Sequence, residues 1–260
     1  MTRVLTRTNF NSSKLIRILS SLSILDSVEK DSDFAEKLGL WVGVADAINL
    51  RAAQNPDSAS RSDMPYGQRT VASESIVDEI TRVRSSLAQS ITKSTSASAG
   101  GARIRIALPI PTSGGSFGDS IAYEPYRRYY LAHQREMELH VRPLRSKVRS
   151  ALAKSSPALS QLADIDAAFE GIFSERESKL LSTLPSLLQK RFKQLYKFHQ
   201  LAQVDNPTED TLEMWMTAGG WLARFCGELQ TVMLAELDMR LQPTEGLMEA
   251  LNNTRKSRYE

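Results

Sequence analysis

The chain has 260 residues, of which 41% are hydrophobic and 24% are charged, with a formal net charge of +3 and one cysteine, Cys226. This length is enough to bury one or two hydrophobic cores, and a lone cysteine excludes an intramolecular disulfide, which favours a reducing compartment. There is no run of about 18 apolar residues, and Arg17 interrupts the first apolar stretch, so we expect neither a membrane span nor a signal peptide and predict a cytoplasmic protein.

Residues 1–92 are predicted to form an N-terminal helical region, made of a hairpin and a third helix. The apolar residues of the first helix share one face: Leu15, Ile18, Leu19, Leu22 and Leu25. The second helix is expected to begin after the capping residue Ser32 and to bury Phe34, Leu38, Trp41, Ala45 and Ile48. A proline- and glycine-containing loop over 53–72 then leads to the third helix, predicted at 73–92.

A low-complexity linker is predicted at 93–120, since the sequence KSTSASAGGA cannot bury enough apolar surface to order itself. Within it, RIRIAL at 103–108 alternates as a β-strand does. This segment is either extended linker or a strand that pairs with a second copy or with another protein. The nearby sequence GGSFG at 114–118 matches a hydrolase nucleophile elbow. That motif needs a parallel sheet, whereas the chain offers one strand candidate, interrupted by Pro109 and Pro111, so we discount it.

Residues 121–251 are predicted to form an elongated bundle of three helical arms that run up, down and up. The first arm, at about 125–154, has a buried face made of Tyr126, Tyr130, His133, Met137, Val141, Leu144, Val148 and Leu152, and Pro143 should kink it. The second arm begins at Ser156 and Pro157 and is bent or restarted by Pro185. Its inward residues are expected to be Leu159, Leu162, Phe169, Phe173, Leu180, Leu184, Leu188, Phe192, Leu195 and Phe198.

The third arm is predicted as one long helix from Asn206, a capping residue, to Pro243, which should end it. Its buried face would contain Leu212, Trp215, Gly219, Leu222, Cys226, Leu229, Met233 and Leu237. Gly219 and Gly220 cost about 1 kcal/mol each in a helix, so they indicate a second helix crossing closely between Trp215 and Trp221, or an aromatic notch for a partner. A short helix at 244–251 and a basic tail at 252–260 should follow.

Charge is distributed unevenly along the chain. Arg128, Arg135, Arg142 and Arg149 lie seven residues apart on one helix, where Arg145 joins them, and together they form a basic stripe. The segment 205–251, in contrast, carries nine acidic and two basic residues. The two could attract each other within the fold; alternatively, the stripe binds the acidic surface of a protein partner or, less favoured, nucleic acid.

Nothing in the sequence predicts a catalytic or metal-binding constellation. His133 and His140 lie seven residues apart with Glu136 between them, but neither histidine follows a glutamate by three residues, as the di-iron sites of helical bundles require. We therefore expect structural histidines, no metal, no cofactor and no enzymatic activity.

Four segments together resemble a family of proteobacterial proteins of unknown function: TNFNSSKLIRILSSLSI, FAEKLGLWVGVADAINL, YRRYYLAHQREMELHVRPLR and FCGELQTVMLAELDMRLQPTEGLMEAL. The resemblance covers both helical regions and omits the two linkers. It implies genes near those of proton-channel-like inner-membrane proteins and OmpA-like proteins, and hence a cytoplasmic accessory to an envelope complex. The sequence thus predicts an all-α, non-enzymatic adaptor with a protein partner, or alternatively a nucleic-acid binder, and leaves its oligomeric state open.

Overall fold

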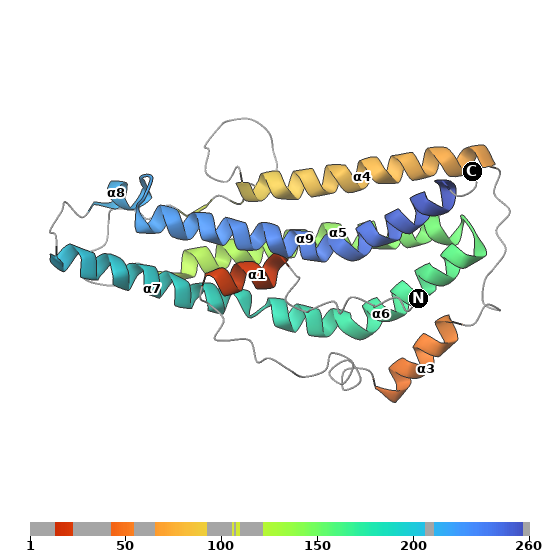
Figure 1. Ribbon diagram of the computed structural model, residues 1–260, viewed down its shortest axis with the longest axis horizontal. Coiled ribbons are helices and arrows are strands. Elements are labelled where there is room, and N and C mark those ends of the chain that lie inside the picture. Colours follow the sequence, from red (N-terminus) through yellow and green to blue (C-terminus); the bar gives the residue numbers. More distant parts are fainter. Residues whose placement is uncertain are drawn as a thin grey trace, which may run out of the picture. The chain divides into compact units, whose positions relative to one another are not determined.

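The computed structural model describes residues 14–22, 43–54, 66–92, 106, 108–109, 122–205 and 211–256. Nearly all of these residues are helical and none is in a strand, which confirms the all-α class (Figure 1). The helices are α1 (Lys14–Ser21), α3 (Val44–Ala53), α4 (Tyr66–Thr92), α5 (Glu124–Ala153), α6 (Pro157–Leu181), α7 (Leu184–Asp205), α8 (Leu212–Met216) and α9 (Trp221–Lys256). None of these described helices is long and apolar enough to cross a membrane.

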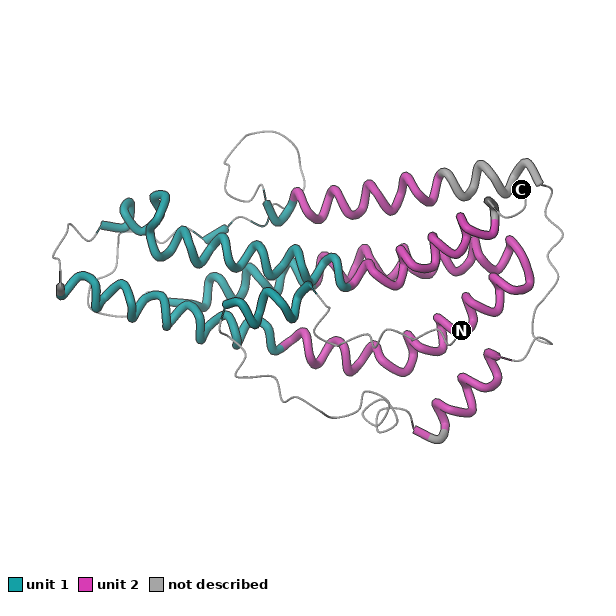
Figure 2. Tube along the Cα trace, viewed as in Figure 1, with its two compact units in different colours: residues 1–30, 90–134, 183–239 teal, residues 31–89, 135–182, 240–260 magenta. Residues whose placement is uncertain are grey.

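The chain divides into two compact units, each built from three separate segments (Figure 2). Unit 1 comprises residues 1–30, 90–134 and 183–239, and unit 2 comprises residues 31–89, 135–182 and 240–260. Helices α4, α5 and α9 therefore contribute residues to both units. The predicted linker at 93–120 lies outside the described residues except for positions 106, 108 and 109, so the predicted domain boundaries stay a prediction.

Unit 1 has an aromatic core between the first part of α5, the middle of α7 and the first part of α9. The rings of Tyr126, Phe192 and Phe225 lie within 4.9–5.7 Å of one another, in the tilted and edge-to-face arrangements that aromatic pairs prefer. The hydroxyl of Tyr123 donates to the backbone carbonyl of Pro185 at 2.5 Å, which fixes the start of α7 against the start of α5. Cys226 is buried here, as expected, and burial raises the pKa of its thiol to about 11.

Unit 2 has an aliphatic core, which the sequence pattern predicted well for α5. Leu144, Val148 and Leu152 of that helix are buried, together with Leu159 and Ala163 of α6 and Leu241, Leu247 and Leu251 of α9. Ser156 caps α6, since its hydroxyl accepts from the backbone N–H of Leu159, and Pro157 occupies the first turn as predicted. Helix α3 packs on α6, where the Gln161 side chain donates to the carbonyl of Gln54.

The prediction of one helix from Asn206 to Pro243 was wrong, because the helix is interrupted between α8 and α9 and does not end at Pro243. Residues 206–210 lie outside the described part, Thr211 caps the short helix α8, and the chain turns at Gly219, whose φ of +95° is left-handed, before α9 begins. Pro243 does not end α9, which continues to Lys256 and absorbs the separate helix predicted at 244–251 and part of the basic tail. Burial of the apolar residues on both sides of Pro243 outweighs the backbone hydrogen bond that the proline removes.

Several other predicted positions also differ. Helix α4 begins at Tyr66, inside the predicted loop 53–72, and the second helix is described only from Val44, so its predicted cap at Ser32 lies outside the described residues. Among the residues expected to be inward, six are exposed: Ala45, Ile48, Phe169, Leu180, Phe198 and Gly219. Helix periodicity identifies an apolar face, but it does not say whether another element covers that face. Residues 114–118 and most of RIRIAL lie outside the described part, and neither Ile106 nor Leu108 forms a strand.

Candidate functional site

The five arginines of the predicted stripe all lie on α5, but they have different surroundings. Arg128, in unit 1, is exposed and lies 3.9 Å from Glu124 in the first turn of the helix, where a carboxylate also suits the helix dipole. Arg135, Arg142, Arg145 and Arg149 belong to unit 2. The five arginines therefore do not share one environment, although their spacing in the sequence places them on one helix.

Arg145 and Arg149 are held by acidic residues of α6. Two nitrogens of Arg145 donate to the two carboxylate oxygens of Asp166 at 2.9 and 2.6 Å, and Arg149 donates to the same carboxylate at 3.1 Å. Arg149 also pairs with Glu170 at 2.6 Å. Burial, the largest single effect, lowers the pKa of the Arg145 guanidinium. The hydrogen bonds to Asp166 and the negative charges of Asp166, Glu170 and Glu177 together outweigh burial and raise this pKa.

Arg135 and Arg142 are exposed and form no ion pair within the described part of the chain. Leu139 lies between them at helical spacings of four and three residues, and it is 71% exposed. We call these three residues the α5 docking face. Arginine is enriched in protein–protein interfaces, so two exposed arginines without an ion pair in the described residues are the part of the stripe best suited to a partner.

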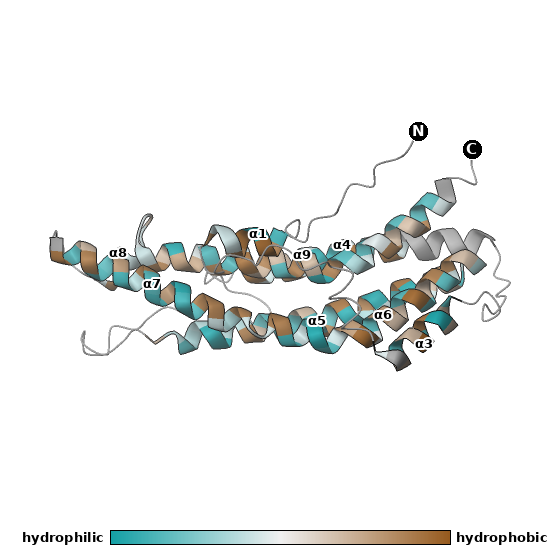
Figure 3. Cartoon of the chain, turned by 60° about the horizontal axis from the view of Figure 1, so that its bottom comes forward, coloured by the Kyte–Doolittle hydropathy of each residue, from teal (hydrophilic) through white to brown (hydrophobic). Residues whose placement is uncertain are grey.

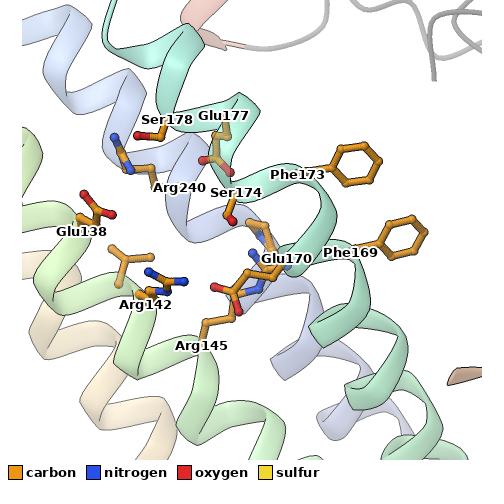
Figure 4. A pocket seen from close by; sticks show the side chains of 12 residues that line it. Glu138, Arg142, Arg145, Phe169, Glu170, Phe173, Ser174, Glu177, Ser178 and Arg240 are labelled. Atoms are coloured by element: carbon orange, nitrogen blue, oxygen red, sulfur yellow. The ribbon is translucent and has the colours of Figure 1, made fainter. Parts of the chain in front are cut away.

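Arg142 also reaches the edge of a hollow in unit 2, whose volume is about 250 Å³ (Figure 4). Three of its lining residues are basic and three are acidic. The basic ones are Arg142 and Arg145 of α5 and Arg240 of α9, and the acidic ones are Glu138 of α5 and Glu170 and Glu177 of α6. Ser174 and Ser178 add hydroxyl groups, whereas the rings of Phe169 and Phe173 point away from the charged residues in Figure 4. The hollow can therefore accept a polar side chain of either sign, but it has no arrangement of nucleophile and base that would predict catalysis.

The four residues of the predicted notch lie in unit 1: Gly219 and Gly220 belong to the turn between α8 and α9, and Trp215 and Trp221 lie on the helices that flank it. Trp215 and Trp221 contact each other, with ring centroids 5.7 Å apart, and the ring of His199 on α7 lies 6.0 Å from each. A Cβ atom on Gly220 would overlap the backbone carbonyls of Trp215 and Met214. The two glycines therefore allow the chain to reverse closely against α8, which replaces the predicted helix crossing.

A buried carboxylate in unit 1 was not predicted. Glu236 of α9 is fully buried and accepts hydrogen bonds from Tyr130 at 2.7 Å and from Gln134 at 3.0 and 3.1 Å, both on α5. The available signal was its position, because Glu236 follows the buried Leu229 by seven residues and so lies on the apolar face of its helix.

Neither histidine of α5 belongs to a metal site in the parts of the chain that the structure describes, where no group of three or more potential ligands occurs. His133 is buried against the ring of Tyr129, and burial lowers its pKa to about 4, so it is neutral at pH 7. His140 is exposed, and its Nδ1 lies 2.8 Å from the backbone carbonyl of Glu136.

These observations define a class: an all-α protein whose described surface presents unpaired arginines beside a hollow of mixed charge. Over residues 1–253 the chain matches the family described as "Protein of unknown function (DUF3348)", and it belongs to that family. No curated protein matches the chain, and no solved structure matches it.

Proposed function

We propose that the protein is a non-enzymatic helical adaptor of the cytoplasm, which holds a protein partner through the α5 docking face. The observation that carries the proposal is the exposure of Leu139 between Arg135 and Arg142, which lack an ion pair in the described residues. The resemblance to proteobacterial proteins whose genes lie beside those of envelope proteins supports an accessory role in an envelope complex.

Charge and geometry favour an acidic partner. A guanidinium binds a carboxylate through two parallel hydrogen bonds, and two arginines seven residues apart offer two such contacts about 10 Å apart. Leu139 would add apolar burial between them, worth about 1.5–3 kcal/mol when complete. A partner carboxylate bound to Arg142 would also lie beside the hollow, where serine hydroxyls can donate further hydrogen bonds.

Nucleic acid is the alternative partner of the same arginines. Arg145 and Arg149 are occupied by Asp166 and Glu170, which leaves fewer cations for phosphate contacts than the sequence suggested. With four phosphates neutralised, the logarithm of the binding constant should fall with the logarithm of salt concentration at a slope of about −3.6; with two, the slope should be about −1.8. Binding to duplex DNA at the steeper slope would favour the alternative.

A pair of charge reversals tests the proposal. Arg135→Glu with Arg142→Glu should reduce recovery of the partner from native cells by at least about tenfold, because both contacts become repulsive. The matched control is Arg82→Glu with Lys154→Glu, which changes two exposed cations of the same unit that form no ion pair in its described residues. Circular dichroism should show unchanged helix content in all variants. Equal recovery by wild type and the Arg135/Arg142 variant, or an equal loss in the control, would contradict the proposal.

A further inference from the structure

Helix α7 carries a second surface, in unit 1, that the proposed function does not use. Between Leu184 and Val204 the helix has four basic residues and no acidic one. Arg191 points inward and pairs with Glu228 through two hydrogen bonds of 2.7 Å. The other three, Lys190, Lys193 and Lys197, are exposed and form no ion pair within the described residues.

The same face of α7 continues with exposed apolar residues. Leu201 and Val204 follow Lys197 at steps of four and three residues, and they are 53% and 79% exposed. Phe198, beside them, is 59% exposed. Hydrophilic and hydrophobic residues both colour this helix in Figure 3. We call Lys190, Lys193, Lys197, Leu201 and Val204 the α7 docking face; it extends about 21 Å along the helix.

The α7 docking face is basic at one end and apolar at the other, which restricts the chemistry of a partner that can bind along it. The lysine half attracts acidic groups, whereas the chain directly after Val204 contains Asp205, Glu209 and Asp210, and Glu213 on α8 is exposed. An anionic lipid surface would be attracted by the lysines, but the sequence that follows the apolar half is acidic and does not favour such a surface. A helix laid along α7 can match each half separately, because its residues three and four apart line one face.

We propose that the α7 docking face binds an amphipathic helix of a partner protein. That helix places acidic residues opposite Lys190, Lys193 and Lys197 and apolar residues opposite Leu201 and Val204. This surface goes beyond the proposed function, since a surface in each unit allows the protein to hold two partners. Removal of the exposed apolar area from water contributes stability, and the lysines determine the partner's direction along the helix.

Site-specific photo-crosslinking in native cells tests this inference on the full chain. A photoreactive amino acid replaces Lys193 or Leu201 in turn, and Asp164, an exposed residue of α6, in a control. Mass spectrometry then identifies the cross-linked segment. We expect both α7 positions to label one segment of one protein, with acidic residues at three- and four-residue steps near the Lys193 label and apolar residues near the Leu201 label. The control position should not label that segment.

A charge-reversal variant completes the test. Lys190→Glu, Lys193→Glu and Lys197→Glu together should lower the yield of the Leu201 cross-link by about tenfold. Arg135→Glu with Arg142→Glu should leave that yield unchanged, so failure of the α5 surface is distinguished from failure of this one. Labelling of lipid, nucleic acid or a second copy of this chain would overturn the inference. So would a labelled segment without acidic residues, or an unchanged yield in the triple variant.

Discussion

Gly219 and Gly220 fix the point where α8 ends and α9 begins. The positive φ of Gly219 is costly for any residue with a Cβ atom, and Gly220 lies directly against the backbone of α8. The sequence identified both glycines as unusual, but it predicted a crossing helix. A glycine pair in an amphipathic pattern indicates close backbone approach, and the approaching backbone is here the preceding turn of the same chain.

Alanine substitutions should separate these two roles from ordinary helix propensity. Gly219→Ala should lower the free energy of unfolding by about 1 kcal/mol through backbone strain, and Gly220→Ala by about 1–3 kcal/mol through overlap with backbone atoms. Gly227→Ala, in the exposed interior of α9 with no atom within 4 Å of the added Cβ, should raise it by up to about 1 kcal/mol. Urea unfolding measures all three. Similar changes in the free energy of unfolding for the three variants would contradict the roles assigned to Gly219 and Gly220 in the turn.

His133 makes stability depend on pH. Its pKa falls from 6.5 in the unfolded chain to about 4 in the folded protein, so between these values the unfolded state binds more protons. The free energy of unfolding should therefore decrease as pH falls from 6.5 to 4, by about 3 kcal/mol from this residue. His133→Gln should remove this contribution to the pH dependence, whereas His140→Gln, at an exposed position, should keep it. Identical pH profiles for wild type and His133→Gln would show that His133 is not buried.

At the scale of elements, Asp166 links α6 to α5 through two arginines. Replacement by alanine leaves Arg145 and Arg149 largely buried with fewer partners, and we expect a loss of about 2–3 kcal/mol in the free energy of unfolding. Asp164→Ala, at an exposed position of the same helix, should change it by less than about 0.5 kcal/mol. Thermal unfolding compares them. A loss that is equal for both variants would mean that the ion pairs contribute no net stability.

The sequence was sufficient to predict most elements because their apolar faces repeat with the helix period. The buried face of α5 is correct at all eight predicted positions, and the N-cap at Ser156 is confirmed. Helix ends were harder to predict. A proline normally ends a helix, but α9 continues through Pro243 because Leu241, Leu247 and Leu251 are buried around it. The free energy gained by burying these leucines here exceeds the tendency of proline to end a helix. Sequence periodicity alone does not reveal which of the two effects is larger.

The site was less predictable than the fold, for the same reason. Spacing placed five arginines on one helix, but only the packing of α6 on α5 shows that Arg145 and Arg149 are occupied while Arg135 and Arg142 are not. The acidic residues that pair with Arg145 and Arg149 are Asp166 and Glu170, and both lie outside the acidic segment 205–251.

At the scale of the whole molecule, each unit is assembled from residues far apart in the chain. In unit 1, Lys14 pairs with Asp238 across 224 positions, and in unit 2, Arg84 pairs with Glu245 across 161. Such pairings leave no local signal in the sequence. Units made of three segments each therefore cannot be recognised from local sequence pattern alone.

Affinity capture of the tagged protein at its endogenous level, with and without nuclease, tests the adaptor most directly. The proteins and nucleic acids recovered are compared between wild type and the variant carrying Arg135→Glu and Arg142→Glu. We predict a defined protein partner that survives nuclease and is lost from the variant. Recovery of nucleic acid with its usual companions, cleared by nuclease, would contradict the adaptor and assign the α5 docking face to nucleic acid.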